Sequence, residues 1–249
     1  MKRISFLIFP FLFLLVAAVS VSAQSVNSNI PERNGDYPDP VHPGIRVRVF
    51  VHEPARGGKP SPTPVPAQCL NPSSTTVDGT TGWKLPTSVD YYVNESSLPA
   101  SVSTSFQNMA GSAFAEWTGQ ITSGAPSVNF AGSTSINRNA YDGANVITFG
   151  RTQGSALAVT YTRYNTSTHM VVDVDTIMNI KFAWASGCAS NSYDVSNILT
   201  HELGHWYGLD DSYDLSYSNN TMYGYGSKAE TKKITPEQGD KDGINQIYP

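Results

Sequence analysis

The spacing of apolar side chains divides the main part of the chain into short strands and longer helical stretches. The segment SVDYYVN, from Ser88 to Asn94, is rich in β-branched and aromatic residues and predicts a strand. A helix is predicted next, because apolar residues then recur every three or four positions: Val102, Phe106, Met109, Ala110, Ala113, Phe114 and Trp117. Further strands are predicted in the segments SVNF, NVITFG, ALAVTYTRY and MVVDVDTIMNI.

Two more helices are predicted towards the C-terminus. Asp194 is a suitable N-cap for a helix that runs through Tyr207. A last short helix fits PEQGDKDGINQIY, with Pro236 in its first turn. The resulting order is strand, helix, four strands, helix, loop and helix. It predicts a twisted sheet backed by helices.

The chain before this main domain has a different composition. Nine of the sixteen prolines in the whole sequence fall between Gln24 and Gln68, and a segment of this kind buries little apolar surface. Within it, only IRVRVFVHE predicts a strand, because its apolar residues alternate from Ile45 to Val51. We therefore expect residues 24–82 to be a Pro-rich leader, a propeptide or a linker, and residues 83–249 to form one domain.

The first 23 residues carry the pattern of a secretory signal peptide. Lys2 and Arg3 precede an apolar run that closes with small residues up to Ala23. An uncleaved membrane anchor is the alternative, since the run approaches spanning length, but Pro10 interrupts it. Removing the two basic residues takes the formal net charge from −4 to −6. An acidic surface argues against nucleic acid or anionic membranes as partners, and we expect a secreted protein without stable membrane association.

The segment HELGHWYGLDD carries the candidate chemistry. His201 and His205 stand four residues apart, so both imidazoles lie on one helix face and can bind one metal ion. Glu202 points along the same side and can act as general base without being a ligand. Gly208 permits the positive φ that ends a helix, and Asp211 can then supply a third ligand, leaving a fourth position open. Random placement gives His-Glu-x-x-His in roughly three such chains per thousand, so chance explains the pattern poorly.

This chain resembles the matrixin branch of the metzincin metallopeptidases, whose signature joins His-Glu-x-x-His-x-x-Gly-x-x-His (or Asp) to a methionine turn. HELGHWYGLDD supplies the first part and NTMYGYG the second, which places Met222 in the turn beneath the metal. AFAEW, NVITFG, SALAVTY and ITPEQGDKDGINQIY occur in the family's order, so the resemblance covers about Trp83 to Pro249. It implies an α+β metzincin-like zinc peptidase domain over residues 83–249. Its parts would be a twisted, mainly parallel sheet with an antiparallel edge strand, a zinc helix, the Met-turn and a C-terminal helix.

The ligand set departs from that family. Matrixins carry a third histidine where Asp211 stands, and in this respect the chain looks like the small snapalysin-type secreted peptidases. Asp210 competes as third ligand, although we prefer for it a role at the helix end or beside a ligand. The second, structural zinc of matrixins is not carried over, because YNTSTHMVVDVD offers only His169. Structural calcium stays open, and its candidate ligands are Asp173, Asp175 and Asp214.

Two tyrosines follow Met222 and are candidates for the oxyanion site or the substrate pocket. The hydroxyl of Tyr223 or Tyr225 could donate a hydrogen bond to a developing oxyanion. In astacin-like relatives such a tyrosine stands two residues past the methionine, and here that position is Gly224. Lining the pocket is therefore the role that we prefer for both.

The two cysteines, Cys69 and Cys188, leave two interpretations. An even count in an exported protein favours a disulfide. Alternatively, Cys69 lies where matrixin propeptides carry a thiolate that blocks the zinc. PAQCLNP lacks the Arg-Cys-Gly core of that motif, so we favour the disulfide.

These features predict a secreted, monomeric zinc metalloendopeptidase with one catalytic zinc. The resemblance implies that Glu202 serves as general base and acid for a metal-activated water that hydrolyses peptide bonds. A protein or peptide substrate is expected to lie extended against an edge strand near Ala156 to Tyr161.

Two other functions stay open. The same zinc chemistry could serve a non-peptide amidase, which would cleave small amides but not proteins. A secreted binding module with a vestigial metal site is the second alternative. The intact Glu202 speaks against it, because loss of the base is the simplest route to an inactive enzyme.

Overall fold

The computed structural model describes residues 30–55 and 69–249. The predicted signal peptide, residues 1–23, lies outside the described residues. Within the two described ranges, no helix is long and apolar enough to cross a membrane.

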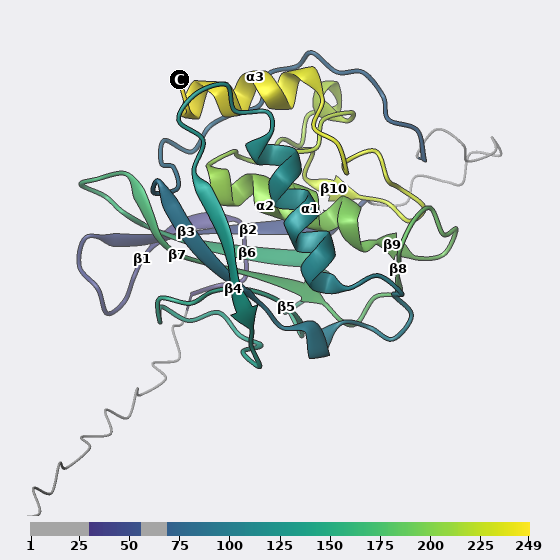
Figure 1. The fold of residues 1–249 in the computed structure, drawn as a ribbon, viewed down its shortest axis with the longest axis horizontal. Coiled ribbons are helices and arrows are strands. Elements are labelled where there is room, and N and C mark those ends of the chain that lie inside the picture. The colour runs from purple at the N-terminus through teal and green to yellow at the C-terminus, as the bar shows by residue number, and fades with distance from the viewer. Residues whose placement is uncertain (1–29, 56–68) are drawn as a thin grey trace, which may run out of the picture.

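One eight-stranded sheet organises the molecule (Figure 1). Its strands follow the order β1, β2, β6, β7, β5, β3 and β4, and β10 pairs with β2 beside this path. Neighbours are antiparallel from β1 to β7 and parallel from β7 to β4, and β10 is parallel to β2. The strands are β1 (Gly35–Pro38), β2 (Ile45–Pro54), β3 (Ser88–Val93), β4 (Ser127–Ser133), β5 (Asn145–Gly150), β6 (Ala158–Asn165), β7 (Met170–Asn179) and β10 (Tyr225–Gly226). A separate pair joins β8 (Trp184–Ala185) to β9 (Tyr193–Asp194).

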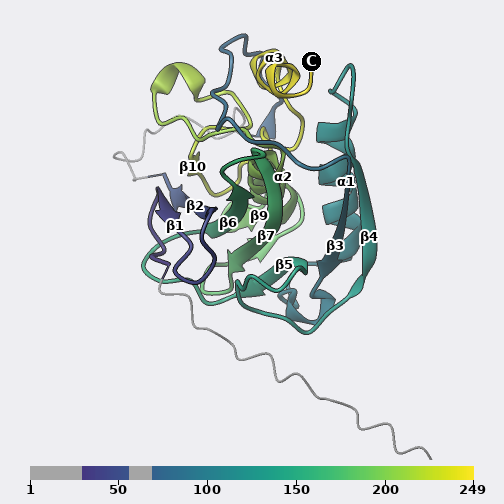
Figure 2. The same cartoon turned by 90° about the vertical axis from the view of Figure 1, so that its left-hand side faces the viewer.

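Two helices pack side by side against this sheet, and a third lies near the C-terminus (Figures 1 and 2). The helices are α1 (Phe106–Thr118), α2 (Val195–Tyr207) and α3 (Gln238–Ile247), with short 3-10 turns at η2 (Glu95–Ser97) and η3 (Leu215–Tyr217). The apolar stripe of α1 faces α2 and the sheet, and its Trp117 indole donates to the Thr200 carbonyl across a 2.7 Å hydrogen bond. The main core therefore lies between the helices and the sheet.

The expected fold class is confirmed, and two helix signals hold in detail. Asp194 is the N-cap of α2, and its side chain accepts a hydrogen bond from the Asn197 backbone N–H. Gly208 ends that helix with a φ of +104°. Pro236 differs from expectation, because α3 begins after the N-cap Glu237 and Pro236 precedes it. Glu237 and Asp240 form a reciprocal capping box, which fixes the start of α3 at that point.

The segment before the main domain contributes more to the fold than its composition suggests. β2 forms as predicted, but it is an inner strand of the sheet, and Val47, Val49 and Phe50 are fully buried. Its alternation places Phe50 in the main core, whereas Val47 and Val49 join a smaller cluster on the opposite face. β6, which we expected to offer a free edge near Ala156 to Tyr161, is paired along that stretch with β2. The antiparallel strand at this edge is β1.

Candidate metal centre

Helix α2 brings two imidazoles together in the interior. The rings of His201 and His205 lie 4.9 Å apart between centroids, and both side chains are buried. The Nδ1 atom of His201 lies 2.7 Å from the Thr221 carbonyl, and that of His205 lies 3.0 Å from the Leu209 carbonyl. Because a carbonyl only accepts, each Nδ1 carries the proton, and each Nε2 keeps its lone pair for a metal.

The turn at Gly208 returns the chain so that Asp211 meets these imidazoles. Its Oδ1 lies 3.1 Å from His201 Nε2 and 3.5 Å from His205 Nε2. Its neighbour Asp210 points elsewhere and binds Arg48 at 2.8 Å. The geometry therefore groups Asp211, and not Asp210, with the two histidines.

The three atoms that face one another fit a zinc ion. His201 Nε2, His205 Nε2 and Asp211 Oδ1 lie within 4.8 Å of one another. All three are buried and, among the described residues, have no hydrogen-bond partner. Buried polar atoms are almost always paired in native proteins, so three that converge on one point suit a ligand from outside the chain. Two imidazole nitrogens and one carboxylate oxygen are the donor set of a catalytic zinc site with one further position.

The charge states of these candidate ligands suit metal binding. Burial lowers the pKa of His201 to about 4, so this imidazole is neutral. Burial opposes ionisation of Asp211, but His205 and His201 outweigh it and hold its pKa well below the usual range. For His205, burial acts to lower the pKa, yet the negative charge of Asp211 raises it overall. A metal ion would take the place of the extra proton that Asp211 favours on the His205 imidazole.

Glu202 lies beside the candidate ligands, and only one of its two carboxylate oxygens has a hydrogen-bond partner among the described residues. Its Oε2 accepts a 2.6 Å hydrogen bond from the Thr160 hydroxyl of β6. Its Oε1 has no hydrogen-bond partner in the part of the chain that the structure describes. Burial raises the pKa of Glu202 to about 7, although nearby His205 acts to lower it. A carboxylate poised near neutrality can both accept and return a proton.

Met222 lies beneath α2 in a tightly packed turn. It is fully buried, and a Cβ added at Gly204 would collide with its sulfur, so the turn and the helix approach closely. Asp240 of α3 accepts hydrogen bonds from the Thr221 backbone N–H at 3.0 Å and from the Met222 backbone N–H at 3.3 Å. Since the Thr221 carbonyl contacts His201, Asp240 helps to hold that imidazole. Sequence reasoning missed this role, because nothing in the α3 segment links it to α2.

A tyrosine that the sequence did not single out contacts Asp211. Tyr213 donates a 3.1 Å hydrogen bond to Asp211 Oδ2. The rings of Tyr223 and Tyr225 pack against each other 5.6 Å apart, and both backbone carbonyls accept hydrogen bonds from buried Lys233. Tyr213 follows Asp211 by two residues, and this closeness was the only available sequence signal.

A third histidine also reaches the centre, from β2. The ring of His52 lies 4.0 Å from that of His201, and its Nδ1 lies 3.3 Å from Glu202 Oε1. Phe50 of the same strand stacks on His205 with centroids 3.7 Å apart. His52, His201 and Glu202 form a second group whose atoms could share a metal ion. The alternation in β2 points both side chains inward, but only the fold reveals what they meet.

The two cysteines form a disulfide. Cys69 and Cys188 are bonded to each other, with Cα atoms 5.9 Å apart, and neither of the two cysteines in the chain is left as a free thiol. The disulfide interpretation is confirmed, and Cys69 cannot serve as a thiolate that blocks zinc in this form.

Of the three candidate calcium ligands, two share one guanidinium, and the third caps a short helix. Asp173 and Asp175 face Arg163, whose guanidinium lies 2.8 Å and 3.4 Å from their carboxylates. Asp214 caps η3 by accepting from the Ser216 backbone N–H. The structure does not bring these three side chains together into a cluster of described metal-binding groups, and calcium binding stays a prediction.

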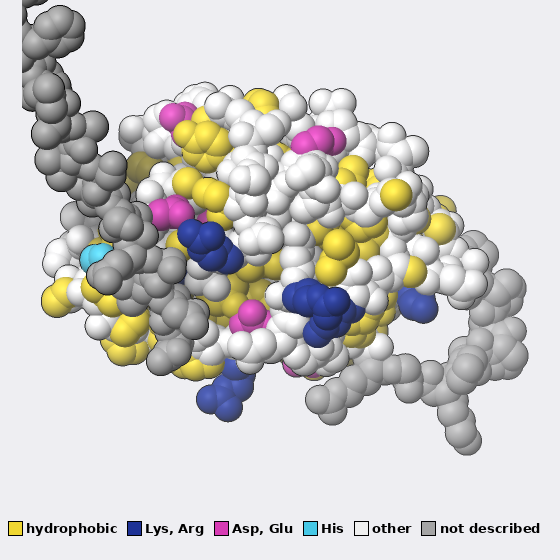
Figure 3. Space-filling view, turned by 90° about the horizontal axis from the view of Figure 1, so that it is seen from below, with side chains coloured by type: hydrophobic (Ala, Val, Ile, Leu, Met, Phe, Trp, Pro, Cys, Tyr) yellow, Lys and Arg dark blue, Asp and Glu magenta, His cyan; other side chains and the backbone are white. Residues whose placement is uncertain are grey.

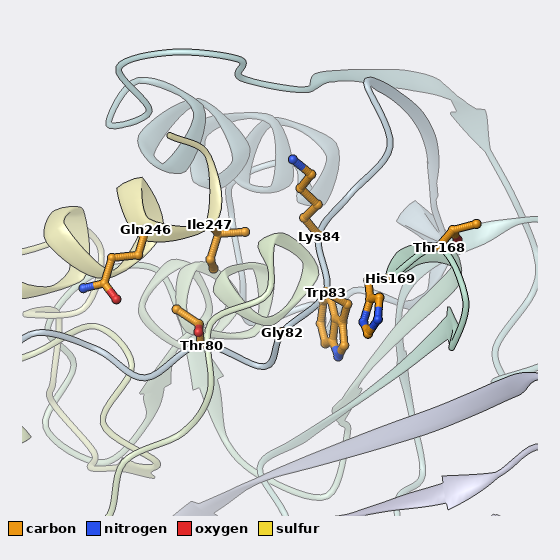
Figure 4. Close-up of a pocket in the computed structure, with 8 residues that line it drawn as sticks. All are labelled: Thr80, Gly82, Trp83, Lys84, Thr168, His169, Gln246 and Ile247. Atoms are coloured by element: carbon orange, nitrogen blue, oxygen red, sulfur yellow. The ribbon is translucent and has the colours of Figure 1, made fainter.

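The pocket in Figure 4 is separate from the candidate ligands. It has a volume of about 240 Å³ and is lined by Thr80, Gly82, Trp83, Lys84, Thr168, His169, Gln246 and Ile247. Trp83 and His169 lie side by side in it. On the molecular face shown in Figure 3, Lys and Arg side chains stand as separate groups, with acidic and uncharged side chains around them. That face has no extended basic surface of described residues for a nucleic acid.

A comparison with known protein families gives one match. The family model described as Matrixin matches residues 82–249. No curated protein matches the chain at a significant level.

Proposed function

Because the chain belongs to the matrixin family of zinc metallopeptidases, we propose that it is a secreted zinc-dependent endopeptidase with Glu202 as its general base. In this proposal His201, His205 and Asp211 hold one catalytic zinc. The observation that carries it is the group of buried donor atoms without partners among the described residues. These atoms converge beside the Glu202 carboxylate.

The chain's own residues divide the work of hydrolysis. When bound, zinc supplies a Lewis acid that polarises the scissile carbonyl. Glu202 Oε1 takes a proton from the attacking water and delivers it to the leaving amine, while Thr160 holds Oε2 in place. Tyr213 orients the carboxylate of Asp211 through its second oxygen.

An extended peptide would bind along β6 in the place that β2 occupies in this structure. Main-chain hydrogen bonds to the strand would supply affinity, and pockets for alternate side chains would supply selectivity. The N–H and C=O groups of β6 run from Ala158 to Asn165, and Thr160 in this strand also touches Glu202. A substrate on this edge would therefore have its backbone next to the base.

Secretion is supported by the chemistry of the chain. The Cys69–Cys188 disulfide suits an oxidising compartment, and the first 23 residues carry a signal-peptide pattern. We further propose that the protein acts as a monomer on protein or peptide substrates.

Replacing the base tests this function most sharply. Glu202→Ala should lower hydrolysis of a peptide library by at least about a hundredfold, because proton transfer is lost. Zinc should remain bound, because the three ligands are intact. The matched control is Glu116→Ala on α1, which should change neither quantity.

Two results would contradict the assignment. Loss of zinc together with activity would make Glu202 a ligand or a structural residue. Cleavage of small amides with no cleavage of casein or gelatin by the wild-type protein would favour the amidase instead.

A further inference from the structure

The edge on which a substrate would bind is occupied by the chain's own strand β2. It pairs antiparallel with β6 from Ile45 opposite Asn165 to His52 opposite Ala158. On its other side, at its C-terminal end, it pairs in parallel with β10, just after the Met222 turn. β2 thus fills the space between the edge strand and the turn beside the metal centre.

The inward side chains of β2 cover the catalytic groups. Phe50 stacks face to face on His205, with an angle of 7° between the two rings. His52 places Nδ1 3.3 Å from Glu202 Oε1, which is where a water molecule would have to stand to lose a proton to the base. Both side chains are at most 1% exposed, and Glu202 is fully buried.

Further contacts hold β2 on either side of the centre. His52 Nε2 lies 3.3 Å from the ammonium of Lys233, which also donates to the backbone of the β10 segment. Arg48 binds Asp210, the neighbour of the ligand Asp211, at 2.8 Å. The strand is therefore fixed to the same loops that carry the metal ligands and the Met-turn.

The origin of β2 sets it apart from the catalytic domain. The family match begins at residue 82, so residues 45–54 lie outside the conserved unit. A peptidase whose base is closed off by a strand from outside that unit has no access for substrate while the strand stays in place. A permanent structural strand is the competing explanation, because Val47, Val49 and Val51 pack on the opposite sheet face.

We propose that β2 is an intramolecular inhibitory strand, which occupies the peptide-binding edge of β6 and places His52 against Glu202. The protein is then latent until β2 is displaced, and the blocking group is an imidazole and not a thiolate. This inference rests on the proposed peptidase function, since it assigns β2 to the substrate's own position.

A substitution on the outer face of β2 can displace the strand and so tests this proposal. It leaves the side chains around Glu202 unchanged. Val49→Asp buries an unpaired carboxylate in the small cluster and should expel the strand. Val41→Asp, in the same N-terminal segment but 47% exposed, is the matched control. Peptide hydrolysis by Val49→Asp should exceed that of the wild type and of Val41→Asp by at least about tenfold, because the open population rises.

A binding measurement separates the inference from the proposed activity. A fluorescent peptide, IRVRVFVHEP, copies residues Ile45–Pro54 and is titrated into zinc-loaded protein carrying Glu202→Ala. The peptide should bind to protein that carries Val49→Asp in addition to Glu202→Ala. It should not bind to the Glu202→Ala protein in which β2 is unchanged. If Val49→Asp fails to fold, Phe50→Ala with His52→Ala replaces it, because these changes remove the inward anchors alone.

The outcomes are distinct. Equal hydrolysis by all variants, or equal peptide binding with and without Val49→Asp, would make β2 a permanent strand and overturn the inference. Peptide binding only to the opened protein, with no hydrolysis by any variant, would support the inhibitory strand and contradict the peptidase function.

Discussion

Two buried polar clusters lie in this molecule, and they are completed in opposite ways. In the first, His201 Nε2, His205 Nε2 and Asp211 Oδ1 face one another without a hydrogen-bond partner among the described residues. In the second, Arg163 lies between Asp173 and Asp175, and all three side chains are at most 2% exposed. Both clusters contain acidic groups that sequence reasoning offered as metal ligands.

The carboxylates of the second cluster find their partners within the chain itself. Asp173 accepts from Arg163 and from the Gly143 backbone N–H, and Asp175 accepts from the backbone N–H groups of Ala140 and Val146. The guanidinium supplies the positive charge that a calcium ion would otherwise bring. Acidic side chains therefore indicate a metal site only when their oxygens lack hydrogen-bond partners. Asp211 Oδ1 in the first cluster lacks one among the described residues, and this distinguishes it from the carboxylates of the second cluster.

Removing a ligand should have the largest effect. Asp211→Ala leaves two imidazoles, too few for tight tetrahedral binding, so zinc affinity should fall by several orders of magnitude in a chelator competition assay. Asp211→His should restore binding. Asp210→Ala is the matched control and should change affinity by less than about tenfold, because it removes only a neighbouring group. The reverse pattern would make Asp210 the third ligand.

Removing the guanidinium from the second cluster should lower the stability of the fold without changing its zinc content. Arg163→Met leaves two buried carboxylates uncompensated and should cost about 3–5 kcal/mol of unfolding free energy in urea titrations. The control Arg46→Met removes an ion pair with Asp36 that is about a third exposed, and should cost less than about 1 kcal/mol. Zinc content should not change in the folded Arg163→Met protein. A loss below about 1 kcal/mol would show that the guanidinium is not needed to hold these carboxylates.

The same cluster should respond to pH in a defined direction. Burial raises the pKa of Asp173 to about 6, although Arg163 acts to lower it. A group whose folded pKa is raised takes up a proton on folding, so its stability contribution is lost as pH rises towards that value. The penalty of Arg163→Met should therefore be smaller at pH 4 than at pH 7. An equal penalty at both would contradict the raised pKa.

A proton completes a third buried cluster in the folded protein. Burial and nearby Asp240 raise the pKa of Asp78 to about 10, so it is protonated in the folded protein, and Asn220 donates to it at 2.7 Å. Stability should thus fall as pH rises from about 4 towards 10, by at most about 1.4 kcal/mol per unit from this group. Asp78→Asn should flatten that dependence in urea titrations at several pH values. An unchanged slope would mean that Asp78 is ionised.

Much of the fold could be predicted, because its signals are local. The apolar stripe from Phe106 to Trp117, the N-cap Asp194 and the positive-φ Gly208 each act within a few residues, and each appears where expected. The grouping of His201, His205 and Asp211 follows from helix periodicity and one turn, which are also short-range. These features depend little on contacts with residues that are distant in the sequence.

The missed features are long-range in sequence. Phe50 and His52 meet the α2 side chains across some 150 residues, and no spacing rule reports such a meeting. Arg163 appeared as an ordinary strand residue, since only the pairing of β6 with β7 sets it against Asp173. The Pro-rich composition around β2 also suggested a weakly buried leader, whereas burial is decided by the sheet that accepts the strand.

Metal analysis of the purified full-length protein tests the central claim most directly. One zinc per chain should be found in the wild-type protein, and none in the folded His201→Ala, His205→Ala double variant. Arg163→Met should keep its zinc while it remains folded. A folded wild-type protein that binds no zinc, or a double variant that retains it, would contradict the assignment of the unpartnered cluster as the metal centre.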